Sequence, residues 1–287
     1  MGFKKYRIAD GTGFRLQDHD PADTDKFESK EQARTRLTQG VARLRELQDR
    51  LYAQDRWAVL LIFQAMDAAG KDSTIEHVMS GVNPQGTQVF AFKAPSNEEL
   101  DHDFLWRTSR ALPERGRIGV FNRSYYEEVL IVRVHPGILA GQKLPAALVD
   151  DRIWERRFED INALERYLSG NGTLILKFFL NVSKDEQRKR FLSRLDDPDK
   201  NWKFALGDVK EREHWDDYMS AYEEMIASTS TAHAPWHVIP ADHKWFTRMA
   251  VADIIVDALE GLKLEYPVVD AEKKKELQAA RELLDKE

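Results

Sequence analysis

The chain has 287 residues, of which 42% are hydrophobic and 32% charged, the balance of a soluble globular protein with one sizeable core. The absence of cysteine excludes disulfides and thiolate metal sites, and the longest apolar run, Ala58–Phe63, is too short to cross a bilayer. A formal net charge of −6 argues against a nucleic-acid partner, because such proteins usually carry a basic surplus. The first residues contain no apolar secretory segment, so we expect a cytoplasmic protein without a membrane partner.

The first half of the chain is predicted to contain a polar arm followed by alternating helices and strands. Residues 1–28 are polar and are expected to be irregular. Apolar residues then recur at three- and four-residue spacing through Ser29–Gln54, which predicts an amphipathic helix. The elements expected next are a strand at Ala58–Gln64, a helix at Asp72–Ser80, a strand at Gln88–Phe92, a helix at Ser96–Ala111, a strand at Arg117–Phe121 and a helix beginning near Ser124.

The second half continues the same alternation. Ser183 and Glu186 have the spacing of a helix cap, and the apolar run Thr173–Asn181 before them predicts a fully buried strand. The expected elements are a loop at Pro136–Pro145, a helix at Ala146–Leu168, the strand Thr173–Asn181, a helix after Ser183, a charged irregular stretch at Asp196–Glu213, a helix to Ala227, a strand at Trp236–Pro240, a helix at Lys244–Leu262 and a charged helix at Asp270–Lys286.

The stretch Ala58–Lys71, AVLLIFQAMDAAGK, predicts a buried strand that leads into a phosphate-binding loop. It departs from the pattern G-x-x-x-x-G-K-[ST], because Ala65 replaces the first glycine and Asp72 replaces the metal-binding hydroxyl. Asp67 places a carboxylate inside the loop, where a bound phosphate would need a metal ion between the two negative charges. The residues predicted to contact phosphate or nucleotide here are Ala68, Ala69, Gly70, Lys71, Asp72 and Ser73.

Continuous apolar strands that alternate with helices predict a parallel sheet covered on both faces. With the phosphate loop, this indicates an α/β fold, a three-layer α/β/α sandwich of P-loop kinase type over residues 29–265. A helical lid is expected at about residues 184–228, and residues 266–287 form a separate charged helix. Ligands of such sheets bind at the carboxyl ends of the strands, where both Lys71 and Arg123 are expected.

Two further segments carry candidate phosphate ligands. Asn122 and Arg123 follow a predicted strand in the motif FNRSYYEE, and arginine is a bidentate phosphate ligand. Alternatively, the pair is a helix cap and a surface arginine. Basic residues of the predicted lid, Arg194, Lys200 and Lys203, are equally compatible with phosphate binding and with a solvated helix face. Four other basic residues extend a cationic track away from the loop or pair with neighbouring carboxylates: Lys93, Arg107, Arg110 and Arg133.

Three separated motifs, MDAAGKD, FNRSYYEE and FLSRLDDPDKNWKFALGDVKEREHWDDY, together resemble polyphosphate kinase family 2 over residues 29–262. The resemblance implies reversible, Mg²⁺-dependent (or Mn²⁺-dependent) phosphoryl transfer between inorganic polyphosphate and AMP or ADP, with ATP as a product and guanine nucleotides as further acceptors. It covers the P-loop kinase fold and the lid. Within the family, the residues at positions 122 and 127, Asn122 and Glu127, are similar to those of the class that phosphorylates both nucleoside mono- and diphosphates.

Carried onto this sequence, the resemblance assigns catalytic positions to Asp67, Lys71 and Arg123. It assigns acceptor selection to Asn122 and Glu127, and these two with Asp67 would hold the metal. Arg194, Lys200 and Lys203 match the lid, while Lys93, Arg107, Arg110 and Arg133 are the candidates for a polyphosphate channel. We also expect a homo-oligomer.

Two other functions remain open from the residues alone. The first is an ATP-dependent small-molecule or nucleotide kinase. It is disfavoured by Asp67 inside the loop and by Asp72 in the place of the usual serine or threonine. The second is a nucleotide- or polyphosphate-binding module without catalysis, which the net charge of −6 does not favour.

Overall fold

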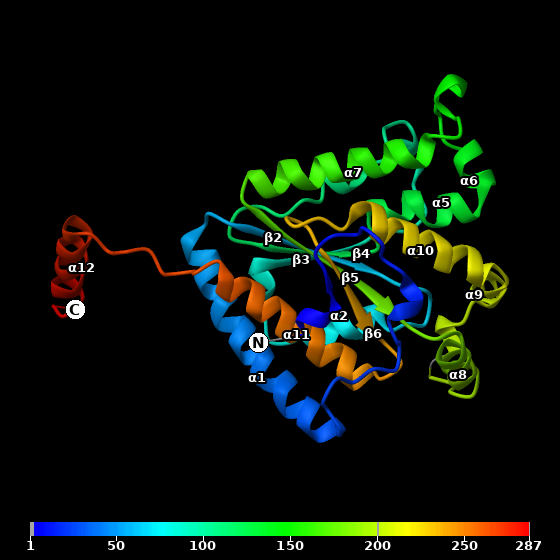
Figure 1. Cartoon of the computed structure of the whole chain (residues 1–287). Helices are drawn as coiled ribbons and strands as arrows, with labels where there is room; N and C mark the ends of the chain where they lie inside the picture. Colours follow the sequence, from blue (N-terminus) through cyan, green and yellow to red (C-terminus); the bar gives the residue numbers. More distant parts are fainter. Residues whose placement is uncertain (1–2, 200, 287) are drawn as a thin grey trace.

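The computed structural model describes residues 3–199 and 201–286, which fold around a six-stranded sheet (Figure 1). The strand order is β1-β6-β5-β2-β4-β3, and all neighbours are parallel except β1 and β6, which are antiparallel. The predicted α/β fold with a parallel sheet is therefore confirmed. The strands are β1 Arg7–Ile8, β2 Ala58–Gln64, β3 Thr87–Ala91, β4 Ile118–Asn122, β5 Thr173–Asn181 and β6 Trp236–Pro240.

Helices cover both faces of this sheet. On one face lie α1 Lys30–Gln54, α2 Lys71–Met79 and α11 Lys244–Gly261, and on the other lie α7 Ile153–Gly170 and α10 Trp215–Thr229 (Figure 1). The central strands are apolar because both of their faces are covered, and every residue of β2 is buried. Among the described residues, no helix is both long and apolar enough to span a membrane.

Seven further α-helices belong to the described residues. Figure 1 shows α8 and α9 near the end of β5, and it shows α12 apart from the layers at the end of an extended segment. No residue of α12 is buried. These helices are α3 Asn97–Leu100, α4 Trp106–Ser109, α5 Ile131–Val134, α6 Pro136–Ala140, α8 Lys184–Leu195, α9 Leu206–Lys210 and α12 Ala271–Leu284.

The N-terminal segment is more ordered than the irregular arm predicted for it. Part of it forms β1, which pairs with β6 at the edge of the sheet. Phe3 and Tyr6 are buried, and their rings lie 5.6 and 5.9 Å from the ring of Phe246 on α11. Two anchoring rings in an otherwise polar stretch produce no periodic pattern, so the sequence did not reveal this packing.

The predicted continuous helix over Ser96–Ala111 is wrong, because α3 and α4 are separate. The capping box that opens α3 does form: Ser96 Oγ accepts a hydrogen bond from the Glu99 amide at 3.2 Å, and the Glu99 carboxylate accepts one from the Ser96 amide at 2.7 Å. The carboxylate of Asp103 then accepts a hydrogen bond from the Leu105 amide at 2.9 Å. Such a local side-chain bond competes with helix continuation and starts a new turn.

Other predicted elements also differ in detail. A 3₁₀ helix, Tyr125–Val129, follows Ser124 in place of an α-helix. Pro136 opens α6 inside the predicted loop, since proline is tolerated in a first helical turn. The helix predicted from Ala146 begins only at Ile153, because the carboxylate of Asp150 accepts a hydrogen bond from the Arg152 amide at 3.0 Å and forms a turn.

A buried polar cluster ties the FNRSYYEE segment to the sheet. The Lys177 ammonium on β5 lies 2.6 Å from the Glu165 carboxylate on α7, and neither side chain is exposed. Lys177 also donates hydrogen bonds to Tyr126 Oη at 2.8 Å and to the Thr229 carbonyl at 2.7 Å. The hydroxyls of Tyr125 and Tyr126 donate to Glu165 at 2.9 and 2.7 Å. The cluster therefore holds the segment after β4 against β5 and α7.

We expect Lys177→Met to lower the free energy of unfolding by about 3–5 kcal/mol, because it leaves the buried Glu165 carboxylate without its countercharge. Urea unfolding at pH 7 measures this loss. The double variant Lys177→Met/Glu165→Leu should recover part of it, since both charges are then absent. A single variant as stable as the wild type would contradict the structural role of the cluster.

We expect buried His237 on β6 to make the folded protein less stable at acidic pH. Its side chain is buried, and burial lowers its pKa to about 4 from an ordinary value near 6.5. Between these values the unfolded chain binds a proton at His237 that the folded chain does not bind, so stability falls as the pH drops from about 6.5 to about 4. The loss reaches about 3 kcal/mol at the lower end. In urea unfolding at pH 7 and pH 4.5, His237→Gln should lose less stability than the wild type; equal losses would exclude this origin.

Candidate active site

The candidate site lies at the carboxyl ends of β2 and β4. These strands pair in parallel with Phe63 opposite Asn122, and the Arg123 amide donates a hydrogen bond to the Phe63 carbonyl at 3.1 Å. The predicted phosphate loop, which follows β2, and the Asn122-Arg123 pair, which follows β4, are therefore neighbours. This is the edge at which α/β sheets bind ligands.

The loop between β2 and α2 has the backbone of a tight turn. The Ala69 amide donates a hydrogen bond to the Met66 carbonyl at 3.2 Å, and Gly70 has a φ of +105°, which only glycine adopts without strain. Ala68 has a φ of +61° although it is not glycine, so the loop stores strain that its surroundings must hold. The loop leads directly into the first turn of α2, where unpaired amide groups attract anions.

Lys71, the first residue of α2, folds back over the loop. Its ammonium donates a hydrogen bond to the Ala65 carbonyl at 2.8 Å, and the side chain is only 8% exposed. Burial lowers the pKa of Lys71, while the nearby Asp67 carboxylate acts in the opposite direction. The ammonium thus lies close to the loop backbone, and its predicted role as the countercharge of a bound phosphate stays a prediction.

Asp67 and Arg123 form an ion pair across the two motifs. Arg123 Nη2 lies 3.0 Å from Asp67 Oδ1, and both side chains are about one-third exposed. Arg123 has a φ of +63°, a second non-glycine residue in the left-handed region. Burial opposes its charge, but Glu127 and Asp67 together raise the pKa of Arg123. The structure therefore brings together two predicted catalytic residues that are far apart in the sequence.

Glu127 belongs to the same charged group. Burial raises its pKa, whereas Arg123 and Lys71 act to lower it and Asp67 raises it further. Two carboxylates and two cations, Asp67, Glu127, Lys71 and Arg123, thus interact at the strand ends. Burial also raises the pKa of Tyr222 on α10 well above its usual range, with Glu127 and Asp67 adding to the effect. The sequence analysis did not identify Tyr222, because its spacing is that of an ordinary core residue of a helix.

Asn122 contacts the first turn of α2. Its side-chain amide donates a hydrogen bond of 2.6 Å to Asp72 Oδ1 at the start of α2. Ser73 Oγ donates one of 3.2 Å to the Gly70 carbonyl. Asp72, which replaces the usual hydroxyl residue, is therefore an anchor for the segment after β4.

Two buried residues of α8 also reach the loop. Gln187 Nε2 donates a hydrogen bond to the Asp67 carbonyl at 2.8 Å, and Arg190 donates hydrogen bonds to the carbonyls of Ala68 and Ala69. The sequence analysis missed both residues. Their three-residue spacing was visible, but in so polar a helix it does not distinguish a loop contact from a solvated face.

Other predicted lid residues are only partly described. Arg194 is half-buried, and its guanidinium lies 5.5 Å from the Phe191 ring. Lys200 and the side chain of Lys203 lie outside the described residues. Burial raises the pKa of Asp208 on α9, the negative charge of Asp67 raises it further, and Arg194 acts to lower it.

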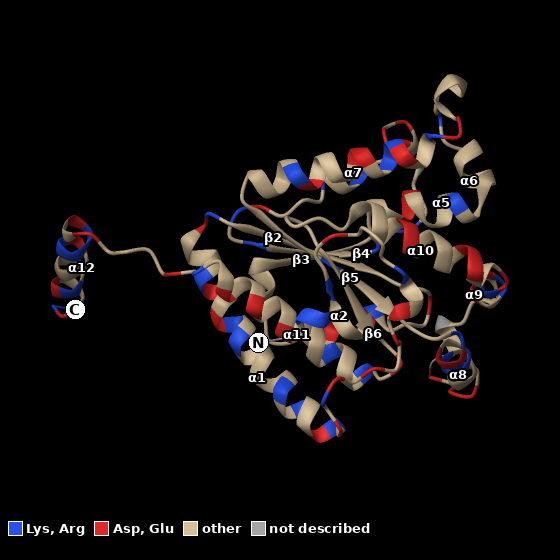
Figure 2. Ribbon diagram, in the orientation of Figure 1, with Lys and Arg blue, Asp and Glu red and all other residues tan. Residues whose placement is uncertain are grey.

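Three of the four candidates for a polyphosphate channel, Arg107, Arg110 and Arg133, have side-chain partners within the chain. Arg107 donates a hydrogen bond of 2.7 Å to the Lys93 carbonyl and lies 3.7 Å from the Glu128 carboxylate. The Arg110 guanidinium lies 4.7 Å from the Trp106 ring. Arg133 pairs with Glu224 at 2.6 Å. Figure 2 likewise shows basic and acidic segments intermixed on α1, α7 and α12.

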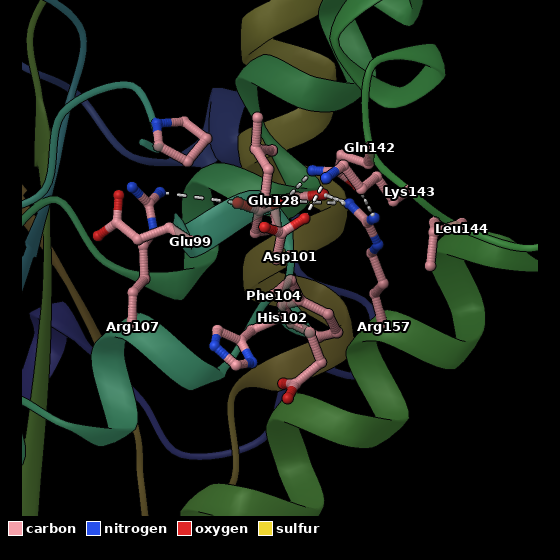
Figure 3. Close-up of a pocket in the computed structure, with 13 residues that line it drawn as sticks. Glu99, Asp101, His102, Phe104, Arg107, Glu128, Gln142, Lys143, Leu144 and Arg157 are labelled. Carbon is pink, nitrogen blue, oxygen red and sulfur yellow. Dashed lines mark hydrogen bonds and ion pairs between the residues drawn. The ribbon is translucent and has the colours of Figure 1, made fainter. Parts of the chain in front are cut away.

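A cavity of about 310 Å³ lies beside the FNRSYYEE segment, around the buried carboxylate of Glu128 (Figure 3). Gln142 Nε2 donates a hydrogen bond to this carboxylate at 2.6 Å, and Arg107 and Arg157 lie 3.7 and 3.4 Å from it on either side. Four acidic residues against three basic ones give the lining a formal charge of −1. The lining comprises Pro95, Glu99, Leu100, Asp101, His102, Asp103, Phe104, Arg107, Glu128, Gln142, Lys143, Leu144 and Arg157.

Comparison with known proteins identifies related chains over almost the whole length. The family model of polyphosphate kinase 2 matches residues 27–267. An ADP-polyphosphate phosphotransferase of Rhodopseudomonas palustris is 54% identical over 283 residues, which cover 98% of each chain. An AMP/ADP-polyphosphate phosphotransferase of Meiothermus ruber is 46% identical over 265 residues, covering 92% of this chain and 95% of the relative. The crystal structure of polyphosphate kinase 2 from Arthrobacter aurescens matches with a TM-score of 0.87 and 44% identity over 96% of both chains.

Proposed function

Because this chain belongs to the polyphosphate kinase 2 family, we propose that it transfers phosphoryl groups reversibly between inorganic polyphosphate and the adenine nucleotides AMP and ADP. The observation that carries the proposal is the charged group at the strand ends, in which Asp67 pairs with Arg123 beside the buried Lys71. Such a group is suited to hold two phosphate chains end to end.

The chemistry requires alignment and charge neutralisation more than a general base. A terminal phosphate oxygen of AMP or ADP attacks the terminal phosphorus of polyphosphate, the bridging P–O bond breaks, and the polyphosphate chain leaves one unit shorter. The attacking oxygen is already ionised near pH 7, so no side chain has to accept a proton. Lys71 and Arg123 would bind the oxygens of the transferred group, whose charge spreads in the transition state.

A divalent cation fits the carboxylates of the site. Asp67 and Glu127 interact with each other and with both cations. Among the described residues no three His, Asp or Glu side chains form a metal cage. Mg²⁺ is commonly held by one or two carboxylates together with substrate phosphates, and this arrangement suits Asp67 and Glu127, with Asn122 as a neighbouring amide. When bound, Mg²⁺ or Mn²⁺ would neutralise phosphate charge next to Asp67.

The cavity in Figure 3 is our candidate for the nucleoside part of the acceptor. Glu128, which lines the cavity, follows Glu127 in the chain, and Glu127 interacts with Arg123 of the charged group. A lining of charge −1 disfavours a polyanion but accepts a neutral base and sugar. We therefore assign Arg107 to this cavity more readily than to a polyphosphate channel.

Acceptor choice, polyphosphate path and assembly remain predictions. Asn122 and Glu127 are the candidates for selecting between AMP and ADP. The lid at residues 184–228, with Arg194, Lys200 and Lys203, and the channel residues Lys93, Arg110 and Arg133 would hold the donor. A homo-oligomer without nucleic-acid or membrane partners is still expected.

The direct test is an assay with Mg²⁺, long-chain polyphosphate and either AMP or ADP, in which each nucleotide is followed by chromatography. We expect ADP and ATP from AMP, and ATP from ADP, with all turnover lost when EDTA is added. Turnover with ATP as the donor but none with polyphosphate would identify an ordinary nucleotide kinase. Tight binding of polyphosphate without any product would indicate a binding module.

We expect Lys71→Ala and Asp67→Asn each to lower turnover by at least about a hundredfold, the scale of losing one transition-state charge contact. Circular dichroism should show both variants folded, because neither side chain belongs to the apolar core. Arg166→Ala, which removes an exposed arginine of α7, is the control and should retain wild-type turnover. Near-normal rates in a folded Lys71 or Asp67 variant would exclude the proposed roles.

A further inference from the structure

Arg190 on α8 connects two loops that follow the carboxyl ends of strands β2 and β6. Its side chain is 6% exposed, so its guanidinium is almost fully withdrawn from solvent. Nη1 donates hydrogen bonds to the carbonyls of Ala68 at 3.1 Å and Ala69 at 2.7 Å, and Nη2 donates to those of Ala241 at 2.6 Å and Asp242 at 3.2 Å. The guanidinium thereby connects the phosphate loop with the loop that follows β6.

The same guanidinium has no donor left for a ligand. Its fifth N–H group, on Nε, donates to the Glu186 carboxylate at 2.8 Å, one turn earlier on α8. An arginine side chain carries five N–H donors, and all five have protein acceptors here. Arg190 is therefore unlike Lys71 and Arg123, because it acts on the loop backbone and not on a phosphate.

Gln187 contacts the loop residue that precedes the two held by Arg190. It lies three positions before Arg190 on the same face of α8 and is 1% exposed. Its side-chain amide donates to the Asp67 carbonyl at 2.8 Å, and its own oxygen accepts a hydrogen bond from Arg212 at 2.5 Å. Two side chains of α8 thus hold three consecutive carbonyls of the phosphate loop, those of Asp67, Ala68 and Ala69.

This arrangement decides where the loop amides point. In a planar trans peptide the carbonyl and the next N–H group lie on opposite sides, so carbonyls turned toward α8 turn the amides of Ala68, Ala69 and Gly70 away from it. The Ala69 amide closes the turn onto the Met66 carbonyl, and by the same geometry the amides of Ala68 and Gly70 face away from α8. Holding these carbonyls also maintains the left-handed backbone of Ala68.

We propose that Arg190 and Gln187 are positioning residues that preset the amides of the phosphate loop for the phosphates of the substrate. This inference rests on the proposed function for the identity of those phosphates. It assigns to the first helix of the predicted lid a role in shaping the loop, in addition to any role in covering the ligand.

The test separates the geometry of Arg190 from its charge. Arg190→Lys keeps the positive charge but cannot bridge the two loops with donors on one nitrogen. We expect its turnover and its calorimetric affinity for inorganic tripolyphosphate each to fall at least about tenfold, since small misplacements of a site have effects of this size. Wild-type values in Arg190→Lys would overturn the proposal, because charge alone would then suffice.

Arg190→Ala provides an independent readout. Guanidinium chloride at millimolar concentration should restore part of its turnover, whereas urea or sodium chloride at the same concentration should not. Loss of this buried side chain also lowers the fraction of folded protein, so turnover is expressed per folded molecule from the thermal unfolding curve of the variant. A wild-type rate per folded molecule would overturn the proposal.

Gln187→Glu tests the second contact in a variant of nearly unchanged size. It retains an acceptor for Arg212 but lacks the donor for the Asp67 carbonyl. We expect kcat to fall severalfold with little change in the KM for ADP, and an unchanged kcat would overturn the role of Gln187. If the wild type fails to use polyphosphate, the proposed function fails, yet tripolyphosphate affinity still decides whether Arg190 shapes the loop.

Discussion

The parallel pairing of β2 with β4 is the constraint on which the site depends. It sets Phe63 opposite Asn122, and the residues after each strand then lie side by side although more than fifty positions separate them in the chain. The Asp67–Arg123 ion pair at 3.0 Å exists only because of this register. A shift of one residue would turn the strand side chains to the opposite faces and separate the two motifs.

The interior that maintains this register is partly polar. Lys177 and Glu165 form a fully buried pair, and two adjacent tyrosines of the FNRSYYEE segment donate to the same carboxylate. Removing one member leaves an uncompensated charge, so the cluster strongly favours one arrangement of β5, α7 and the segment after β4. The two tyrosines thus fix the segment in the interior of the protein, while Arg123 and Glu127 of the same segment contribute to the charged group of the site.

The charges of the site oppose one another in the free chain. Burial lowers the pKa of Lys71 and raises that of Glu127, so both groups are held where their charged forms are disfavoured. Substrate phosphates would meet the cations, and a divalent ion would meet the carboxylates, which relieves both costs on binding. The strained backbone of Ala68 and Arg123 belongs to the same preorganised site, and α8 holds part of it from outside.

The sequence by itself determined the alternation of strands and helices, the turn before Lys71 that is predicted to bind phosphate, and the family, because burial periodicity and turn chemistry are local properties of the chain. Only the tertiary structure decided which distant groups meet. It added β1 as an antiparallel edge strand, divided the helix predicted from Ser96, and turned Arg107 toward Glu128. It also brought Arg190 onto carbonyls more than 120 residues away. Such partners follow from the packing of whole elements, and no local pattern in a charged helix encodes them.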